Sequence, residues 1–469
     1  MSETKPYIQS LFVEKKIVLD FKRDNLLEEF AADEDNINAV NQILANQKML
    51  VDKWKLINRK KDIDEQKVSI PNATVGKTYE ALINFEKLNW NDIVFSDFEG
   101  LESTGLEYDN ENEIISGIPT QSGDLKIRFK FRLEGEPDDS VLNEKTISLI
   151  INADPKTLWK NIESDKADPY WKEDDVTQFD KLGDKHIVVS SKRGRSHANT
   201  GGFREDDFAY KYFENTGWSA VAVSDGAGSA KLSRAGSKIA CQTIIEYFTE
   251  NLTEESFSVF DVLVQEHNEK TGDDTLKKLS HFVYNTLGKA ALTVHKKLEE
   301  TANKLEVPLK DLHATLIFVL IKKYDFGYAI LSFGVGDCPI GLLNKDMSAI
   351  TLMNWLDVGE FGGGTRFITM PEIFQSDKLS TRFGFQLVDD FSYLMLMTDG
   401  IYDPKFIVEA NLEKIENWKA FLEDLDGKND ENIRVELKAE NTELTTQLSA
   451  WMDFWSSGNH DDRTLAIIF

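Results

Sequence analysis

The hydrophobic residues near the start of the chain recur at the spacing of an α-helix. From Leu26 to Trp54, apolar side chains follow one another at intervals of three and four. Neither Pro nor Gly interrupts the chain between Asn25 and Gln66. We therefore expect a helical region over residues 1–67.

The pattern changes to short alternating runs between residues 68 and 153. The runs at 125–133 and 145–152 alternate apolar and polar side chains, and clusters of Gly, Pro, Asn and Asp separate the runs. This alternation predicts a small antiparallel β sandwich. The polar residues 154–184 follow it, and we expect a linker that Trp159 and Trp171 pin to a neighbouring surface.

Buried-strand patterns and helical patterns interleave from residue 185 to residue 469. This mixture predicts a layered α+β domain, so the whole chain is expected to be multidomain. The charged, helical stretch at 409–452 is interpreted as a lid or a surface insertion. The expected strands are 186–190, 219–225, 314–321, 326–334 and 393–399, and the expected helices are 235–249 and 276–305.

The composition narrows the possible partners. The 469 residues include 41% hydrophobic ones, enough for several cores, and the formal net charge is −27. An acidic surface argues against a nucleic acid and against an anionic membrane as partners. Cys241 and Cys338 are too few for a disulfide framework, and neither lies in the C-x5-R loop of a cysteine phosphatase. With no signal-peptide pattern and no membrane-spanning run, we expect a soluble cytoplasmic protein.

Four acidic sites share one arrangement, in which an apolar strand meets an Asp that often has Gly beside it. Asp-Gly is also a common turn signal, and any one of these sites alone would be interpreted as a turn. Four such sites in one domain favour a rim of carboxylates, the hard oxygen ligands of Mg²⁺ or Mn²⁺. The four sites are REDD at 204–207, VSDGAG at 223–228, MTDG at 397–400 and HDDRT at 460–464.

Part of the β region resembles the bacterial immunoglobulin-like modules of cadherin-like and adhesion proteins. The resemblance covers one module, over residues 105–131, and implies an interaction domain that binds a protein partner. It comes with no dense set of acidic ligands, so we expect no calcium site there. The residues that match the family pattern are Ile115, Ser116, Gly117, Pro119, Thr120 and Gly123.

The motifs of the C-terminal region, taken in order, resemble those of the metal-dependent protein phosphatases of the 2C type. The resemblance runs from 185 to 469 and implies a β sandwich flanked by helices, with a two-metal centre at one end. The opening motif, with Ser196, His197, Gly201 and Asp206, and the loop GEFGGGTRFIT at 359–369 are similar to a bacterial branch. The ordered motifs are RGRSHANTGGFREDD, VAVSDGAGSAKLSRAG, HATLIFVL, FGVGDCPIG, LMLMTDGIYD and HDDRTLAIIF.

The resemblance implies a set of metal ligands. Asp225 would bridge two Mn²⁺ or Mg²⁺ ions, and the carbonyl of Gly226 would bind one of them. Asp399 and Asp461 would complete the coordination of the other. Two such ions lower the pKa of a shared water and neutralise charge on a phosphoryl group.

Four further acidic residues receive supporting roles from the same resemblance. Glu205 and Asp206 form the acidic pair of the first motif, one binding metal directly and the other through water. Asp337 is the candidate ligand of a third, weakly bound ion. Asp462 stands where the family often has Asn and would support its neighbours.

One position departs from the family pattern. Many members carry an Arg, five residues before the first-motif Asp, that holds the substrate phosphate, and Gly201 occupies that position here. His197, Arg193 or Arg195 could serve instead. We favour His197 as a phosphate ligand or leaving-group acid, because imidazole titrates near neutral pH. A hydrogen-bonded structural histidine is an equal alternative.

Two functions remain open, and a third, an extracellular calcium-dependent adhesion protein, rests on the β module alone. The first is hydrolysis of phosphoserine and phosphothreonine in proteins, with the N-terminal regions recruiting a substrate or partner and a Ser/Thr kinase acting on the same targets. The second is a catalytically weak scaffold in a signalling complex. Asp225, Asp399 and Asp461 favour the enzyme, because a scaffold has no need for converging unpaired carboxylates. Gly201 favours the scaffold.

Overall fold

The chain folds into two compact units. The structure, a computed structural model, describes residues 3–269, 272–357, 364–456 and 458–469. Its units are Met1–Leu158 and Trp159–Phe469. The stretch expected to be a linker is therefore divided between them, with residues 159–184 in the second unit. Within the described residues, no helix is long and apolar enough to cross a membrane.

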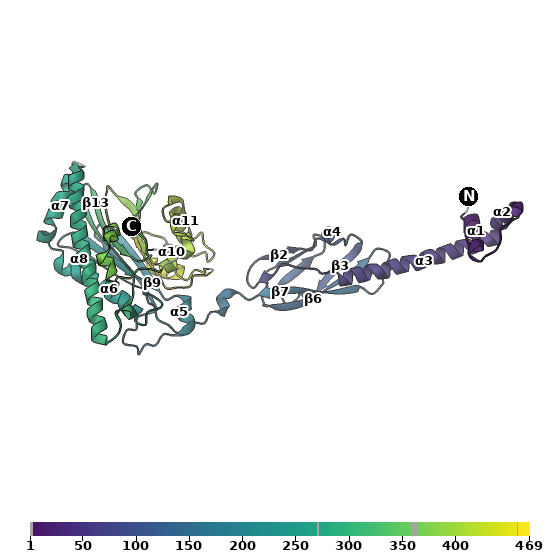
Figure 1. The fold of residues 1–469 in the computed structure, drawn as a ribbon, viewed down its shortest axis with the longest axis horizontal. Helices are drawn as coiled ribbons and strands as arrows, with labels where there is room; N and C mark the ends of the chain where they lie inside the picture. Colours follow the sequence, from purple (N-terminus) through teal and green to yellow (C-terminus); the bar gives the residue numbers. More distant parts are fainter. Residues whose placement is uncertain (1–2, 270–271, 358–363, 457) are drawn as a thin grey trace. The chain divides into compact units, whose positions relative to one another are not determined.

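The first unit begins with three helices, as the periodicity predicts: α1 (Thr4–Glu14), α2 (Asp24–Ala32) and α3 (Glu34–Glu65) (Figure 1). Asp33 caps α3, because its carboxylate accepts hydrogen bonds from the first backbone N–H groups of the helix. A small core joins α1, α2 and the start of α3, and the end of α3 enters the next core through Ile63. Every residue from 45 to 55 is exposed.

The β region forms the expected sandwich, although β1 pairs with β7 in parallel. One sheet has the order β1-β7-β6-β3 and the other β2-β5-β4, and a shared apolar core lies between them. Gly117, in the ISGxPT turn, has φ +141°, and a Cβ there would approach the Gly105 carbonyl oxygen to 2.3 Å. The elements are β1 (Ala73–Thr74), β2 (Tyr79–Leu82), α4 (Phe85–Leu88), β3 (Ile93–Glu99), β4 (Leu106–Asp109), β5 (Ile114–Gly117), β6 (Gly123–Leu133) and β7 (Asn143–Asn152).

Two antiparallel sheets form the centre of the second unit. The orders are β10-β11-β12-β13-β16 and β15-β14-β17-β18-β9-β8, and an apolar core fills the space between them. All five expected strands are present. The strands are β8 (Asp175–Leu182), β9 (Lys185–Lys192), β10 (Asp207–Phe213), β11 (Trp218–Ser224), β12 (Leu316–Tyr324), β13 (Gly327–Val335), β14 (Ile340–Asn344), β15 (Ile350–Leu352), β16 (Phe383–Val388), β17 (Phe391–Met397) and β18 (Arg463–Ile468).

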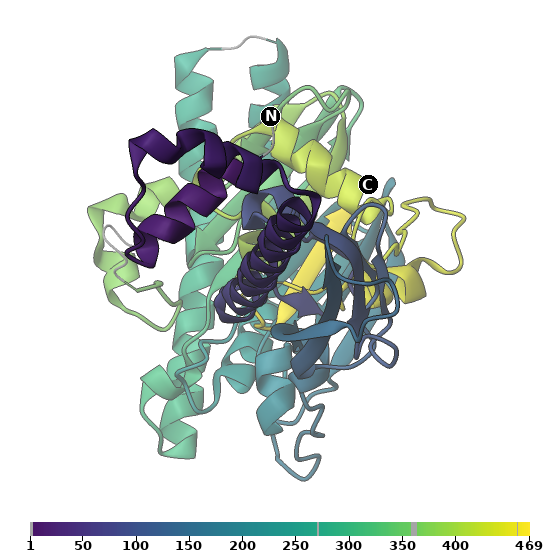
Figure 2. The same ribbon diagram turned by 90° about the vertical axis from the view of Figure 1, so that its right-hand side faces the viewer.

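Helices cover both outer faces of this sandwich, as expected. The β10–β16 sheet packs against α6, α7 and α8, and α8 runs along the unit from end to end (Figures 1 and 2). The other sheet packs against α10, α11 and α12. The helices are α5 (Arg195–Thr200), α6 (Ser233–Asn251), α7 (Glu254–Glu269), α8 (Asp273–Leu305), α9 (Glu372–Gln375), α10 (Asp399–Phe406), α11 (Ile415–Leu425) and α12 (Leu444–Trp451). Single 3-10 turns lie at Phe21–Arg23, Pro155–Leu158, Leu309–Leu312, Asp377–Arg382 and Glu409–Asn411.

The interpretation of 409–452 as a lid or surface insertion is wrong. Its helices α11 and α12 bury Trp418 and Trp451 in the core beneath the second sheet. Gly341 of β14 makes room for this contact, since a Cβ there would lie 2.3 Å from the indole ring of Trp418. The stretch is therefore one of the two outer layers, and its many charged residues belong to the solvent-facing side of an amphipathic layer.

Candidate metal centre

The acidic residues meet at one end of the sandwich because of how the strands are paired. Asp225 follows the last residue of β11, and Glu205 and Asp206 precede β10, its antiparallel neighbour. Asp399 follows β17, and Asp461 and Asp462 precede β18, which pairs antiparallel with β17. Both sheets therefore deliver carboxylates to the same end, as the sequence indicates.

Asp225 lies at the centre of this group. Its pKa is raised well above the usual value by burial and then by the nearby charges of Asp399 and Asp206. Burial, with the charges of Asp337 and Asp461, does the same for the pKa of Asp399. Candidate ligand atoms of Asp225, Asp337 and the Cys338 thiol lie within 4.8 Å of one another. Mutual repulsion of this kind is what bound cations relieve.

In the acidic pair of the first motif, Asp206 is buried beside Asp225, and Glu205 is largely buried. Burial and the charge of Asp462 raise the pKa of Asp206 to about 7, although hydrogen bonds partly oppose the rise. Two of those bonds come from the hydroxyls of Thr398 and Thr464, each 2.8 Å from Oδ2 of Asp206. Burial likewise raises the pKa of Glu205 to about 7. Both carboxyls therefore sit in surroundings that disfavour their charge.

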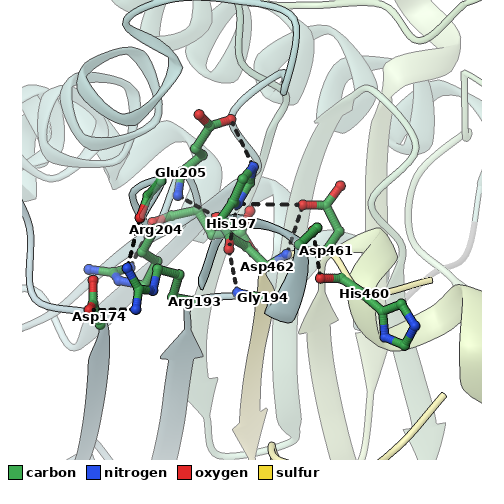
Figure 3. A network of polar contacts seen from close by, with 12 residues as sticks. Asp174, Arg193, Gly194, His197, Arg204, Glu205, His460, Asp461 and Asp462 are labelled. Carbon is green, nitrogen blue, oxygen red and sulfur yellow. Dashed lines mark hydrogen bonds and ion pairs between the residues drawn. The ribbon is translucent and has the colours of Figure 1, made fainter. Parts of the chain in front are cut away.

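His197 lies between carboxylates (Figure 3). Its Nδ1 is 2.9 Å from Oδ1 of Asp462, and its Nε2 faces Oε2 of Glu205 at 3.9 Å. Burial alone would lower the pKa of His197, but the hydrogen bond and charge of Asp462 outweigh it and raise that pKa to about 9. Asp462 also accepts the backbone N–H groups of Gly194 and Glu205. These contacts favour the structural alternative for His197, and they place Asp462 against His197, Gly194 and Glu205.

The donor set fits divalent cations. Within the part of the chain that the structure describes, buried carboxylate oxygens of three residues have no hydrogen-bond partner: Oε2 of Glu205, Oδ1 of Asp206 and Oδ1 of Asp337. Leaving such atoms unpaired is costly unless they serve another ligand. A cluster of oxygen donors is the environment that Mg²⁺ and Mn²⁺ prefer.

Arg193 and Arg195, two of the candidates to replace the family arginine, have guanidinium groups that bind other partners. The guanidinium of Arg193 is buried, donating to the Gly202 carbonyl and the Asn161 side chain at 2.8 Å and pairing with Asp174 at 3.2 Å. The Arg195 guanidinium donates a hydrogen bond to the Asp453 carbonyl and lies over the Trp455 ring.

Gly201 has a structural reason to be glycine. It ends α5 with φ +75°, a backbone conformation that favours Gly. A Cβ there would also come within 3.1 Å of the Ile162 side chain. An Arg at this position would therefore strain the end of α5.

Several residues at the site were missed by the sequence reasoning. Thr398 and Thr464 donate hydrogen bonds to Asp206. Thr398 belongs to the MTDG motif and Thr464 to the HDDRT motif, so the sequence offered a signal for both. The Thr315 hydroxyl accepts the Asp225 backbone N–H at 2.9 Å. Lys172 lies in the expected linker, and no motif there marks it.

The loop expected at 359–369 is described only in part. Gly359 to Gly363 lie outside the described residues. In the described part, the Thr365 hydroxyl donates to Oδ2 of Asp337 at 2.7 Å, which ties this loop to the candidate third site.

Comparisons with known proteins identify a family for this unit. The model of the family described as protein phosphatase 2C matches residues 193–452, more than half of the chain. No curated protein matches. Among solved structures, similar ones include a serine/threonine phosphatase of S. agalactiae (15% identity, 61% of this chain and 99% of that chain, TM-score 0.34) and Stp1 of Staphylococcus aureus (14%, 62% and 97%, 0.33). The catalytic domain of PstP in complex with two manganese ions is another (14%, 60% and 96%, 0.34). By the family match, this chain belongs to the protein phosphatase 2C family.

Proposed function

We propose that the second unit hydrolyses phosphoserine and phosphothreonine in proteins, using two Mn²⁺ or Mg²⁺ ions. One observation carries the proposal: the carboxylates of Asp225, Asp399 and Asp461 converge at one end of the sandwich, where burial and neighbouring carboxylates raise the pKa of Asp225 and of Asp399. Family membership supports the reaction class. By the resemblance, Asp225 and the Gly226 carbonyl would hold the two ions, and Asp337 would hold a third.

The chain's own residues prepare the site for this chemistry. When bound, the ions activate a water and neutralise the charge that develops on the phosphoryl oxygens. Thr398 and Thr464 hold Asp206 in place, and Thr315 anchors the Asp225 backbone. His197 is protonated near neutral pH because its pKa is about 9, and it orders Asp462 and Glu205. We therefore assign it to positioning these carboxylates, in preference to a direct bond with phosphate.

Hydrolysis of p-nitrophenyl phosphate and of a phosphothreonine peptide tests the proposal. We expect turnover with Mn²⁺ or Mg²⁺ that EDTA reduces to background, because the carboxylate cluster has no other means of activating water. A folded protein that binds Mn²⁺ yet turns over neither substrate would instead establish the scaffold alternative.

We also infer that the first unit recruits an acidic protein partner. On α3, Ile43, Leu50, Trp54 and Ile57 lie on one face and are between 39% and 65% exposed. Such a face, left uncovered on a long helix, is typical of a binding surface. Among the described residues, Lys53 flanks this face and has no ion-pair partner, whereas Lys48 and Lys55 lie on the opposite side of α3. The charge of Lys53 favours a partner groove with an acidic group at its rim.

A photo-cross-linking residue at position 54, in the full chain inside its own cells, tests the inferred surface. We expect a cross-linked protein from position 54 that is absent from position 41, which is exposed on the opposite side of α3. Reversing the charge with Lys53→Glu should reduce the yield several-fold, as expected for steering by opposite charge. Lys55→Glu, on the other side of α3, is the matched control and should leave the yield unchanged. Equal yields from the two positions, or cross-links only to lipid or to a second copy, would contradict the inference.

A further inference from the structure

The segment 159–174, here called the strap, lies against the loop that carries the first acidic motif. Backbone hydrogen bonds fix its start, from the Ile162 N–H to the Ala198 carbonyl at 2.9 Å and from the Lys160 N–H to the Asn199 side chain at 3.0 Å. The Ile162 side chain packs over Gly201. The strap therefore covers α5 and the position where the family often has arginine.

Further contacts hold the rest of the strap in the second unit. Asp168 pairs with Arg234 of α6 at 2.7 Å, close to the Asp225 loop. The Trp171 indole N–H donates to the Ser164 hydroxyl at 3.0 Å, and that hydroxyl donates to Asp174. These interactions explain why the tryptophan-bearing segment belongs to this unit. The family match begins only at residue 193, so the strap lies outside it.

Lys172 connects the strap to the acidic pair itself. Its side chain is 3% exposed, and its ammonium group lies 2.7 Å from the Asp206 carbonyl and 3.3 Å from the Glu205 carbonyl. Asp207 and the Ser237 hydroxyl, both at 3.1 Å, complete its surroundings. A buried ammonium is stable only when its donors are satisfied in this way.

The backbone of the acidic pair is therefore held from two sides. The carboxylate of Asp462 accepts the N–H of Glu205, and the ammonium of Lys172 donates to the carbonyls that follow. The backbone from which both side chains of the pair project is thereby fixed in place. Groups that hold ligands in this way affect metal affinity although they never touch the metal.

We propose that the strap is a positioning element of the metal centre and that Lys172 is its positioning residue. The proposal rests on the proposed function, because it takes Glu205 and Asp206 as residues that hold the ions. It makes a segment of the second unit that precedes the family match a determinant of metal affinity.

The dissociation constant for Mn²⁺, measured by calorimetry on the full chain, tests this role separately from activity. We expect Lys172→Met to weaken binding about tenfold, the lower range for groups that support metal ligands. The matched control is Lys322→Met, which removes another largely buried lysine, paired with Asp261 at 2.9 Å between β12 and α7. It should lower the melting temperature without changing Mn²⁺ affinity.

An unchanged Mn²⁺ affinity in folded Lys172→Met would overturn the proposal. Should that variant not fold, Asp168→Asn loosens the strap at Arg234 and decides the question by the same criterion. Wild-type protein that binds Mn²⁺ but does not hydrolyse phosphate esters would contradict the proposed function. It would leave the role of Lys172 standing, because that role is measured on Mn²⁺ binding.

Discussion

Asp225→Asn is expected to reduce metal-dependent phosphate hydrolysis by about 1,000-fold, which corresponds to roughly 4 kcal/mol of transition-state stabilisation. Asp225 is the most central carboxylate of the cluster, with the charges of Asp399, Asp206, Asp337 and Asp461 all acting on it. An amide of the same shape keeps the packing but offers no negative charge to a cation. The measurement is the initial rate with p-nitrophenyl phosphate at saturating Mn²⁺.

The same variant should make the metal-free protein more stable. The fold holds the buried Asp225 among like charges, which raises its pKa, and a neutral side chain removes that cost. In EDTA at pH 8 we expect a higher melting temperature than that of the wild type, with no further rise on adding Mn²⁺. Asp325→Asn, in the exposed turn between β12 and β13, is the control that should change neither property. Wild-type activity in Asp225→Asn would show that the Asp225 carboxylate does not hold the catalytic ions.

The main architecture of both units was predictable because their central elements are buried on both faces or are strongly periodic. β11 and β13 are buried along their whole length and read as continuous apolar runs. β16 was missed because none of its residues is fully buried, so its sequence has no clear pattern. The error at 409–452 arose because charges on the outer face of α11 concealed Trp418 and Phe421, which lie on its buried face.

The candidate site was predictable where its chemistry belongs to side chains at strand ends. Asp225, Asp399 and Asp461 each stand in a motif, and strand pairing brings them together. Lys172 could not be found in this way, because it acts on backbone carbonyls more than 30 residues further along the chain. Because every residue has a backbone carbonyl, a sequence pattern cannot show which carbonyls a lysine binds. The role of Gly201 was hidden for a similar reason, since its left-handed backbone depends on how α5 ends.

The stability of the metal-free protein is expected to fall as pH rises from 5 to 8. The folded state raises the pKa of Asp206 and of Glu205 to about 7, while unfolded carboxyls titrate near 4. Between these values the folded state binds more protons than the unfolded state, so raising the pH favours unfolding. His197 acts in the same direction above pH 6.5. Its pKa is about 9 in the folded state, where it contacts Asp462, so the folded state holds a proton that the unfolded state has released, and this stabilisation is lost as the pH rises toward 9.

Bound Mn²⁺ should reverse this trend, because the cations bind the deprotonated carboxylates and release their protons. We expect the free energy of unfolding of the second unit, in EDTA, to fall by about 5 kcal/mol between pH 5 and pH 8. Asp206 and Glu205 each keep their proton in the folded state over about two pH units of this interval, and each unit corresponds to about 1.4 kcal/mol. With Mn²⁺ in excess, the same interval should show a constant or rising stability. Scanning calorimetry at a series of pH values measures both, and Asp225→Asn should have a shallower slope in EDTA. A metal-free stability that rises with pH would show that burial and neighbouring charges do not raise the pKa of these carboxyls in the fold, and the case for a cation site at this end of the sandwich would lose its physical basis.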